Sequence, residues 1–158
     1  AIINGFDEKL NEMMKGFLDG IGYVGFANFD MKFDQRDGTY KLFEMNLRQG
    51  RSSFFVTAAG YNLAKWLVDD VIYHKDLPCT VAKNKVLWTI IPTKIIFDYV
   101  HNESAKKEAR ALIREGKVCH SYYYNKDRSL RRLINYAKNQ FHYFEKYKRY
   151  FGNKGLRD

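Results

Sequence analysis

The sequence predicts an α+β fold, and two kinds of pattern in the 158-residue chain support that prediction. Residues 23–46 alternate apolar and polar side chains on either side of a turn signal, which is typical of an antiparallel β-hairpin. Residues 7–19, 103–115 and 127–151 repeat their apolar side chains at helical spacing instead. The chain is long enough for one domain with a core, so we expect a small sheet packed with helices.

The first helix is expected over residues 7–19, because Asp7 is a favourable N-cap and two glycines follow the last apolar side chain. The hairpin comes next, with strands over residues 23–33 and 39–46 and an Asp-Gly turn between them. One face of its first strand is polar and carries Asn28, Asp30 and Lys32.

Shorter elements are expected after the hairpin. Ser52 or Ser53 should cap a short helix that Gly60 ends, and Asn62 should cap a second helix. A strand is expected just before Pro92. In the last predicted helix, the apolar side chains that share one side are Leu130, Ile134, Ala137, Phe141, Phe144 and Phe151.

The positive charge of the chain is concentrated at its end. Residues 1–52 carry a net charge of −1, residues 53–102 carry +1, and residues 103–158 carry +9. This distribution favours a C-terminal segment that faces a polyanion or an anionic membrane surface. The commoner explanation of such a run is a solvated helix face, and both interpretations stay open.

The remaining gross features indicate a cytoplasmic protein. Cys79 and Cys119 form no CxxC pair, so reduced thiols are expected. The chain starts with neither a methionine nor a signal peptide, which reads as a chain whose beginning is elsewhere. No apolar run approaches the roughly 18 residues that a membrane span needs.

Several well-known motifs are excluded. Gly20, Gly22 and Gly25 match GxGxxG, but they follow a predicted helix and open a strand, whereas a dinucleotide loop does the reverse. No GxxxxGK[ST] loop occurs. The four histidines show no metal-binding spacing and no partnered nucleophile.

The hairpin carries the strongest candidate site. Asp30 lies on the polar face of the first strand, and Glu44 and Asn46 share a face of the second, because side chains alternate with period two. A loop of about four or five residues would put Asp30 opposite or diagonal to Glu44. Two carboxylates so placed repel each other unless a cation lies between them, and an added amide oxygen suits Mg²⁺ or Mn²⁺.

Two arginines follow these candidate ligands. Arg48 and Arg51 could bind phosphoryl oxygens, because guanidinium groups match their geometry and stabilise developing negative charge. The alternative is a half-exposed hairpin whose charges are merely solvated. The order Asp…Glu-x-Asn-x-Arg-x-x-Arg-Ser, followed by a helix with a serine cap, favours a metal and phosphate site instead.

The stretch GFANFDMKFDQRDGTYKLFEMNLRQGRSSFFVTAAGYNLAKWL resembles the closing part of the ATP-grasp fold. That fold occurs in carboxylate–amine ligases and carbamoyl-phosphate-synthase-like proteins. The resemblance covers roughly residues 20–70. It implies that Asp30 binds one Mg²⁺ ion, that Glu44 is shared by two ions, and that Asn46 completes the second.

The same resemblance assigns roles to the residues that follow. Arg48 would be catalytic and stabilise the step that forms an acyl phosphate, while Arg51 and Ser52 would bind the substrate or the phosphate. The family's usual Asn-Pro-Arg reads Asn46-Leu47-Arg48 here. The variant Gln-Gly-Arg-Ser and the tail rich in tyrosine and lysine look like the subgroup near D-aspartate ligases of cell-wall precursor synthesis.

The resemblance implies an ATP- and Mg²⁺-dependent ligase that joins a carboxylate to an amine through an acyl phosphate. Residues 1–100 would be the C-terminal portion of the ATP-grasp domain, and residues 101–158 a helical, basic extension of it. This sequence does not contain the family's phosphate-covering lysines or its adenine-binding hinge, which belong to the earlier half of the fold. We therefore expect this chain to need a missing N-terminal part of the same enzyme and to be inactive without it.

Two other function classes remain as alternatives. One is a non-catalytic ATP-grasp remnant. The other is a nucleic-acid-binding module, because the tail interleaves cations with tyrosines that could stack on bases. Those cations are Arg128, Arg131, Arg132, Lys138, Lys146, Lys148 and Arg149. A nucleic-acid function leaves Asp30, Glu44 and Asn46 unexplained, because carboxylates repel a polyanion in the absence of metal.

Overall fold

The fold is described from a computed structural model that places residues 1–123, 126 and 129–152. The chain divides into two compact units. We call residues 5–53 the hairpin unit, and residues 1–4 together with the described residues from 54 onwards the core unit. Small sheets and helices occur together, in agreement with the predicted α+β class. The predicted division at residue 100 stays a prediction.

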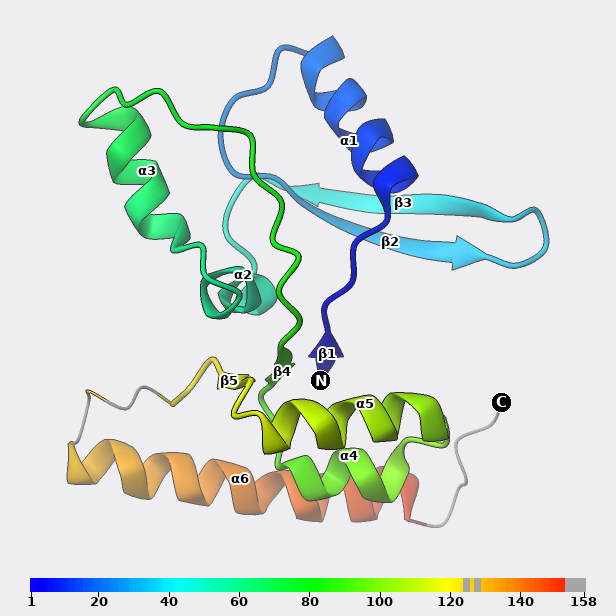
Figure 1. The fold of residues 1–158 in the computed structure, drawn as a ribbon. Coiled ribbons are helices and arrows are strands. Elements are labelled where there is room, and N and C mark those ends of the chain that lie inside the picture. The colour runs from blue at the N-terminus through cyan, green and yellow to red at the C-terminus, as the bar shows by residue number, and fades with distance from the viewer. Residues whose placement is uncertain (124–125, 127–128, 153–158) are drawn as a thin grey trace. The chain divides into compact units, whose positions relative to one another are not determined.

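The hairpin unit begins with helix α1 (Glu8–Gly20), close to the predicted bounds. Asp7 caps it as predicted, because its side chain accepts a hydrogen bond of 2.9 Å from the backbone N–H of Leu10. Gly22 ends it in the left-handed region, at φ 64°. Figure 1 shows α1 lying across one side of the hairpin, where the rings of Phe17 and Phe29 meet edge to face at 6.2 Å.

The predicted hairpin is confirmed as strands β2 (Asn28–Asp34) and β3 (Thr39–Asn46). The first strand begins five residues later than expected. The reason is a local turn, in which the Tyr23 hydroxyl donates a hydrogen bond of 2.7 Å to the Phe26 carbonyl oxygen and Gly25 adopts φ 130°. The predicted Asp-Gly turn is also confirmed, with Gly38 at φ 68°.

The segment after the hairpin forms the 3₁₀ turn η1 (Arg51–Ser53), with which the hairpin unit ends. Ser53 closes that turn, because its Oγ accepts a hydrogen bond of 2.9 Å from the backbone N–H of Gly50. The predicted short helix follows as α2 (Phe54–Ala58), and Gly60 ends it at φ 113°.

The core unit continues with α3 (Leu63–Val71), which Asn62 caps as predicted through a hydrogen bond of 3.1 Å from the Lys65 backbone N–H. The strand expected before Pro92 is present as β4 (Leu87–Thr89), shorter than its apolar run.

Strand β4 lies at the centre of a three-stranded sheet. It pairs antiparallel with β1 (Ile2–Ile3) and parallel with β5 (Val118–His120). Neither outer strand is predicted from the sequence, because two or three residues are too few to show an alternation. Helix α4 (Thr93–Tyr99) is not predicted either, since it starts directly after Pro92 and spans only seven residues.

Two more helices complete the core unit, α5 (Glu103–Arg114) and α6 (Leu130–Phe151). Both predicted helices are confirmed, although residues 127–128 of the second prediction lie outside the described residues. Figure 1 shows α4, α5 and α6 running alongside one another. The buried core between β4, α4 and α5 consists of Leu87, Ile91, Ile95, Ile96, Ala109 and Leu112.

Helix α6 packs with a different side from the one that its apolar residues predict. Tyr143 and Tyr147 lie against the core, whereas Leu130 is 73% exposed and Phe141 is 69% exposed. Tyrosine buries a large apolar ring while its hydroxyl can reach water, so it can line the edge of a core. Within the part of the chain that the structure describes, no helix is both long and apolar enough to cross a membrane.

Candidate functional site

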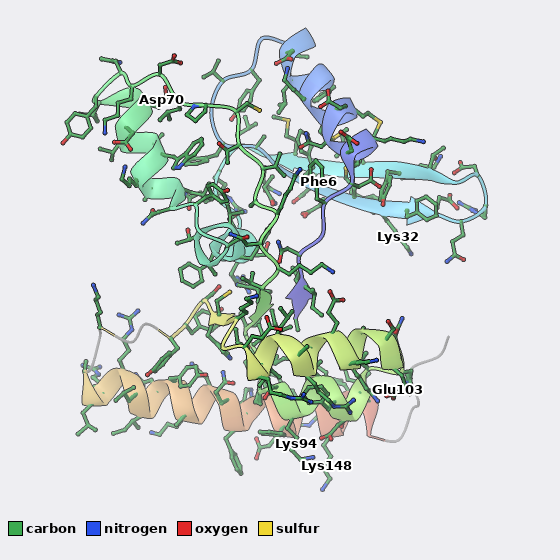
Figure 2. All side chains as sticks on the ribbon, viewed as in Figure 1. Phe6, Lys32, Asp70, Lys94, Glu103 and Lys148 are labelled. Carbon is green, nitrogen blue, oxygen red and sulfur yellow. The ribbon has the colours of Figure 1, made fainter. Side chains whose placement is uncertain are left out.

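The two predicted carboxylates lie directly opposite each other on the hairpin. Asp30 pairs with Glu44, and two positions further along Asn28 pairs with Asn46. Because directly opposed side chains share a face and alternate residues return to it, all four lie on one face of the hairpin. Phe29 packs on α1, so this face is turned away from the helix, and Figure 2 shows Lys32 projecting on that side.

An irregularity in the ladder produces this arrangement. The register shifts between Asp30 and Met31, which leaves Phe43 as one extra residue on β3. In a regular ladder continued from the turn, Asp30 would pair with Phe43, and Glu44 would point to the opposite face. The β-bulge therefore brings the two carboxylates together.

A hydrogen bond fixes the amide beside one of these carboxylates. The Asn46 Nδ2 donates to the Glu44 Oε1 at 2.7 Å. The Asn46 amide and the Glu44 carboxylate are thereby linked on the face that also carries Asp30. Asp30 and Glu44 are exposed and Asn46 is half-buried, so a cation could reach this oxygen set from solvent.

The oxygen set is small for a metal site. No cluster of three or more His, Cys, Asp or Glu side chains suited to a metal ion occurs among the described residues. The set on the hairpin has two carboxylates and an amide, which fits Mg²⁺ when a substrate's phosphates and water supply the remaining oxygens. The donor set is thus compatible with a hard cation bound together with a phosphorylated ligand.

The other predicted site residues follow immediately in the chain. Arg48 is exposed, and its Nη1 lies 3.4 Å from the Gln49 carbonyl oxygen. Arg51 is exposed and begins η1, and Ser52 is half-buried in the same turn. The structure thus places all three residues in the hairpin unit, on the segment that leaves β3.

One neighbour of the site was not singled out from the sequence. Asn28 lies opposite Asn46, and a Cβ added to Gly50 would come within 3.2 Å of its Nδ2. Asn28 therefore packs against the loop that carries Arg48 and Arg51. The spacing of Asn28 and Asp30, two residues apart on one polar face, is the sequence signal that could have identified it.

Burial shifts the pKa values of Cys119 and His120 in the core unit. The pKa of the Cys119 thiol is raised to about 11, so the thiol stays protonated at neutral pH and is a poor nucleophile. The pKa of His120 is lowered, and its buried Nδ1 has no hydrogen-bond partner among the described residues. Neither group offers the partnered base that a catalytic nucleophile requires.

Comparison with known proteins gives one informative similarity. The chain is 44% identical over 157 residues to a D-aspartate ligase of Enterococcus faecium (strain Aus0004). That alignment covers 96% of this chain and 37% of the ligase, so the chain spans little more than a third of its relative's length. No family model matches the chain, and no solved structure matches it.

Proposed function

We propose that this chain is part of an ATP- and Mg²⁺-dependent ligase that joins a carboxylate to an amine. The observation that carries the proposal is the placement of Asp30 directly opposite Glu44, with Asn46 on the same face. The similarity to a ligase along nearly the whole chain supports the same function class. A structural hairpin would gain nothing from two opposed carboxylates, because like charges directly opposite each other destabilise a strand pair.

In the proposed site, Asp30, Glu44 and the Asn46 oxygen would hold Mg²⁺ against the phosphates of ATP. Bound there, the ion would neutralise phosphate charge and orient the γ-phosphoryl group. The hydrogen bond from Asn46 to Glu44 restrains both side chains on the same face of the hairpin. Because these side chains are held by a paired ladder, little ordering is needed when the ligand binds.

Arg48 is the proposed catalytic residue. The γ-phosphoryl group passes from ATP to the substrate carboxylate and ADP leaves; the amine then attacks the acyl carbon and phosphate leaves. Negative charge spreads over the phosphoryl oxygens in the first step, and a guanidinium two residues beyond Asn46 could stabilise it. Arg51 and Ser52 would bind the carboxylate or phosphate of a substrate, since a guanidinium can engage both oxygens at once.

The name of the relative supplies the proposed amino acid, D-aspartate. The proposed role in making cell-wall precursors comes from the resemblance of the Gln-Gly-Arg-Ser variant to the subgroup near D-aspartate ligases. A reaction that consumes ATP and a protein with two free cysteines both fit the cytoplasm. Because the chain matches only 37% of the ligase, we propose that the remaining ATP contacts come from residues outside it. The isolated chain should then not turn over ATP.

The metal site is tested first on the chain itself, by titrating Mn²⁺ with and without ADP and following the paramagnetic resonance of free Mn²⁺. We expect Glu44→Gln to weaken Mn²⁺ binding at least tenfold. Glu12→Gln is the matched control, because Glu12 is an exposed carboxylate on α1 of the same unit. Equal binding by wild type and Glu44→Gln would refute the metal site.

The ligase activity is tested separately, in the polypeptide that the complete reading frame encodes. We expect phosphate release from ATP that depends on an amino acid, with D-aspartate favoured over L-aspartate, and loss of that release in Glu44→Gln. Metal binding without any amino-acid-dependent release would indicate a non-catalytic ATP-grasp remnant and refute the ligase.

A further inference from the structure

Helix α6 exposes a line of apolar side chains that the core unit leaves uncovered. Leu130, Ile134, Phe141 and Phe144 recur at intervals of four, seven and three residues, which places them on one side of the helix. Their exposed fractions are 73%, 47%, 69% and 36%. We call these four residues the α6 stripe. Exposed apolar side chains that gather into one patch are typical of a binding surface, whereas singly scattered ones are not.

Cations line the side of α6 next to the stripe. Arg131, Lys138 and Arg149 lie 7 and 11 residues apart, so at 100° per residue they form a second line beside the stripe. The helix carries six Lys and Arg residues and one Glu, a net charge of +5. Figure 2 shows Lys148, one more of these cations, projecting from α6 away from α4 and α5.

From this pairing of an apolar line with a cationic line, we propose that α6 docks on an anionic lipid membrane surface. A helix lying in the interface places its apolar side chains among the upper acyl chains and its cations among the lipid phosphates. At about 1.5 Å per residue, the stripe extends over roughly 21 Å and the line of cations over roughly 27 Å. The membrane contact of α6 alone would be peripheral and reversible, since a single amphipathic helix binds weakly.

The structure disfavours nucleic acid as the partner of the same helix. Two of the α6 tyrosines that could stack on bases face inward, because the Tyr136 ring meets His120 at 5.5 Å and the Tyr147 ring meets Tyr99 at 5.2 Å. Tyr150 is exposed, but a single exposed ring offers little surface for stacking. The stripe instead offers Leu130 and Ile134, which stack poorly on bases. Arg128, which belonged to the nucleic-acid alternative, lies outside the described residues.

A second copy of the chain is also disfavoured as the partner. Two α6 helices meeting through their stripes would bring two surfaces of charge +5 together, and like charges oppose such a contact. An anionic bilayer can contact the stripe and the cations together, because it is apolar inside and negatively charged at its surface.

The experiment is sedimentation of the chain with vesicles of phosphatidylcholine containing 30% phosphatidylglycerol, beside vesicles of phosphatidylcholine alone, at low and at physiological salt. We expect binding to the anionic vesicles only, weakened by salt. The double variant Leu130→Ser/Phe141→Ser should lose at least fivefold in affinity, and Lys138→Glu a similar amount. Tyr150→Ser is the matched control, because Tyr150 is 63% exposed on α6 but off the stripe.

Four results would overturn the proposal. They are no binding to anionic vesicles, equal binding to neutral ones, an equal loss with Tyr150→Ser, and tighter binding to single-stranded DNA that the double variant leaves unchanged. A dimer in light scattering that the double variant dissociates would assign the stripe to a second copy instead. Circular dichroism of each variant checks that α6 is retained, and exposed positions make misfolding a small risk.

Discussion

Each of the two units is stabilised by a different kind of internal contact. Every residue that the structure describes as buried lies in the core unit, around Leu87 and Ile95, which are each 1% exposed. The hairpin unit, all of whose residues are described, contains none. Its order comes from the backbone ladder of β2 and β3 and from pairs such as Phe33 with Tyr40, whose rings meet at 5.2 Å.

This difference separates stability from the candidate chemistry. The core unit carries the burial that favours folding, whereas the hairpin unit carries Asp30, Glu44 and Asn46 on a face open to solvent. Substitutions at the candidate site should therefore change binding with little effect on the free energy of unfolding, and substitutions in the core should do the reverse. Four predictions test that separation, in order of decreasing effect.

The largest effect is expected from Ile95→Ala in the core. Removing a side chain that is 1% exposed loses apolar burial and leaves a cavity, so the variant should lose about 2–5 kcal/mol of unfolding free energy. Phe33→Ala in the hairpin unit is the comparison, and it should lose less, because Phe33 is 46% exposed. Urea unfolding of both variants measures this, and equal losses would contradict the division described above.

A smaller loss is expected from Thr89→Val. Thr89 is fully buried, and its Oγ1 both accepts from the Ile91 backbone N–H at 3.1 Å and donates to the Ile91 carbonyl oxygen at 2.9 Å. Valine keeps the volume but leaves those groups unpaired, at about 1–3 kcal/mol of stability. Thr80→Val is the control, because its hydroxyl bonds a carbonyl on the exposed surface. Comparable losses in both variants would be against the prediction.

The third prediction concerns pH and Asp69. Lys65 and Lys75 both donate to its carboxylate, and these hydrogen bonds lower the pKa of Asp69 below its usual 3.8. A carboxyl whose folded pKa is lowered adds stability that is fully present above the unfolded pKa and is lost as pH falls through the folded one. Acid unfolding below about pH 4 should therefore be less steep in Asp69→Asn. An unchanged acid profile would show that the ion pairs contribute nothing.

The smallest effect is expected in the hairpin. Asp30 and Glu44 repel each other across the ladder, so Asp30→Asn should raise stability by about 0.2–1 kcal/mol at low salt without divalent cations. Millimolar Mg²⁺ should cancel that gain, because only the wild type keeps both carboxylates for the ion. Thermal unfolding of wild type and Asp30→Asn, with and without Mg²⁺, measures the gain in stability and its cancellation by the ion. A gain that Mg²⁺ leaves unchanged would speak against a cation between these residues.

The sequence was sufficient to predict the hairpin and the face of its site, because an alternating pattern and an Asp-Gly turn are both local signals. It predicted Asp30 as opposite or diagonal to Glu44, and the structure makes the pair directly opposite. The bulge at Phe43 has no such signal, since one extra residue in a strand leaves the composition unchanged. The roles of Arg48, Arg51 and Ser52 stay predictions.

The core unit was harder to predict, for two physical reasons. Strands β1 and β5 and helix α4 are shorter than the windows over which periodicity can be seen. The buried side of α6 was missed because tyrosines cover the core while phenylalanine and leucine face outward. A hydrophobicity pattern ranks Phe141 above Tyr143 and so selects the wrong side.

The bulge at Phe43 determines which inherited length changes the hairpin can accept. Asp34, the last paired residue before the turn, lies four positions after Asp30, whereas Glu44 lies five positions after Thr39. A codon gained or lost among positions 35–38 changes only the tip and leaves the opposed carboxylates in place. A single codon lost between Thr39 and Glu44 would remove the bulge and leave the glutamate opposite Asp30 in a regular ladder, whereas a single codon gained there, with the bulge kept, would turn its carboxylate to the far side of the ribbon. Related genes should therefore vary freely in length at the tip but should not gain a single codon between Thr39 and Glu44.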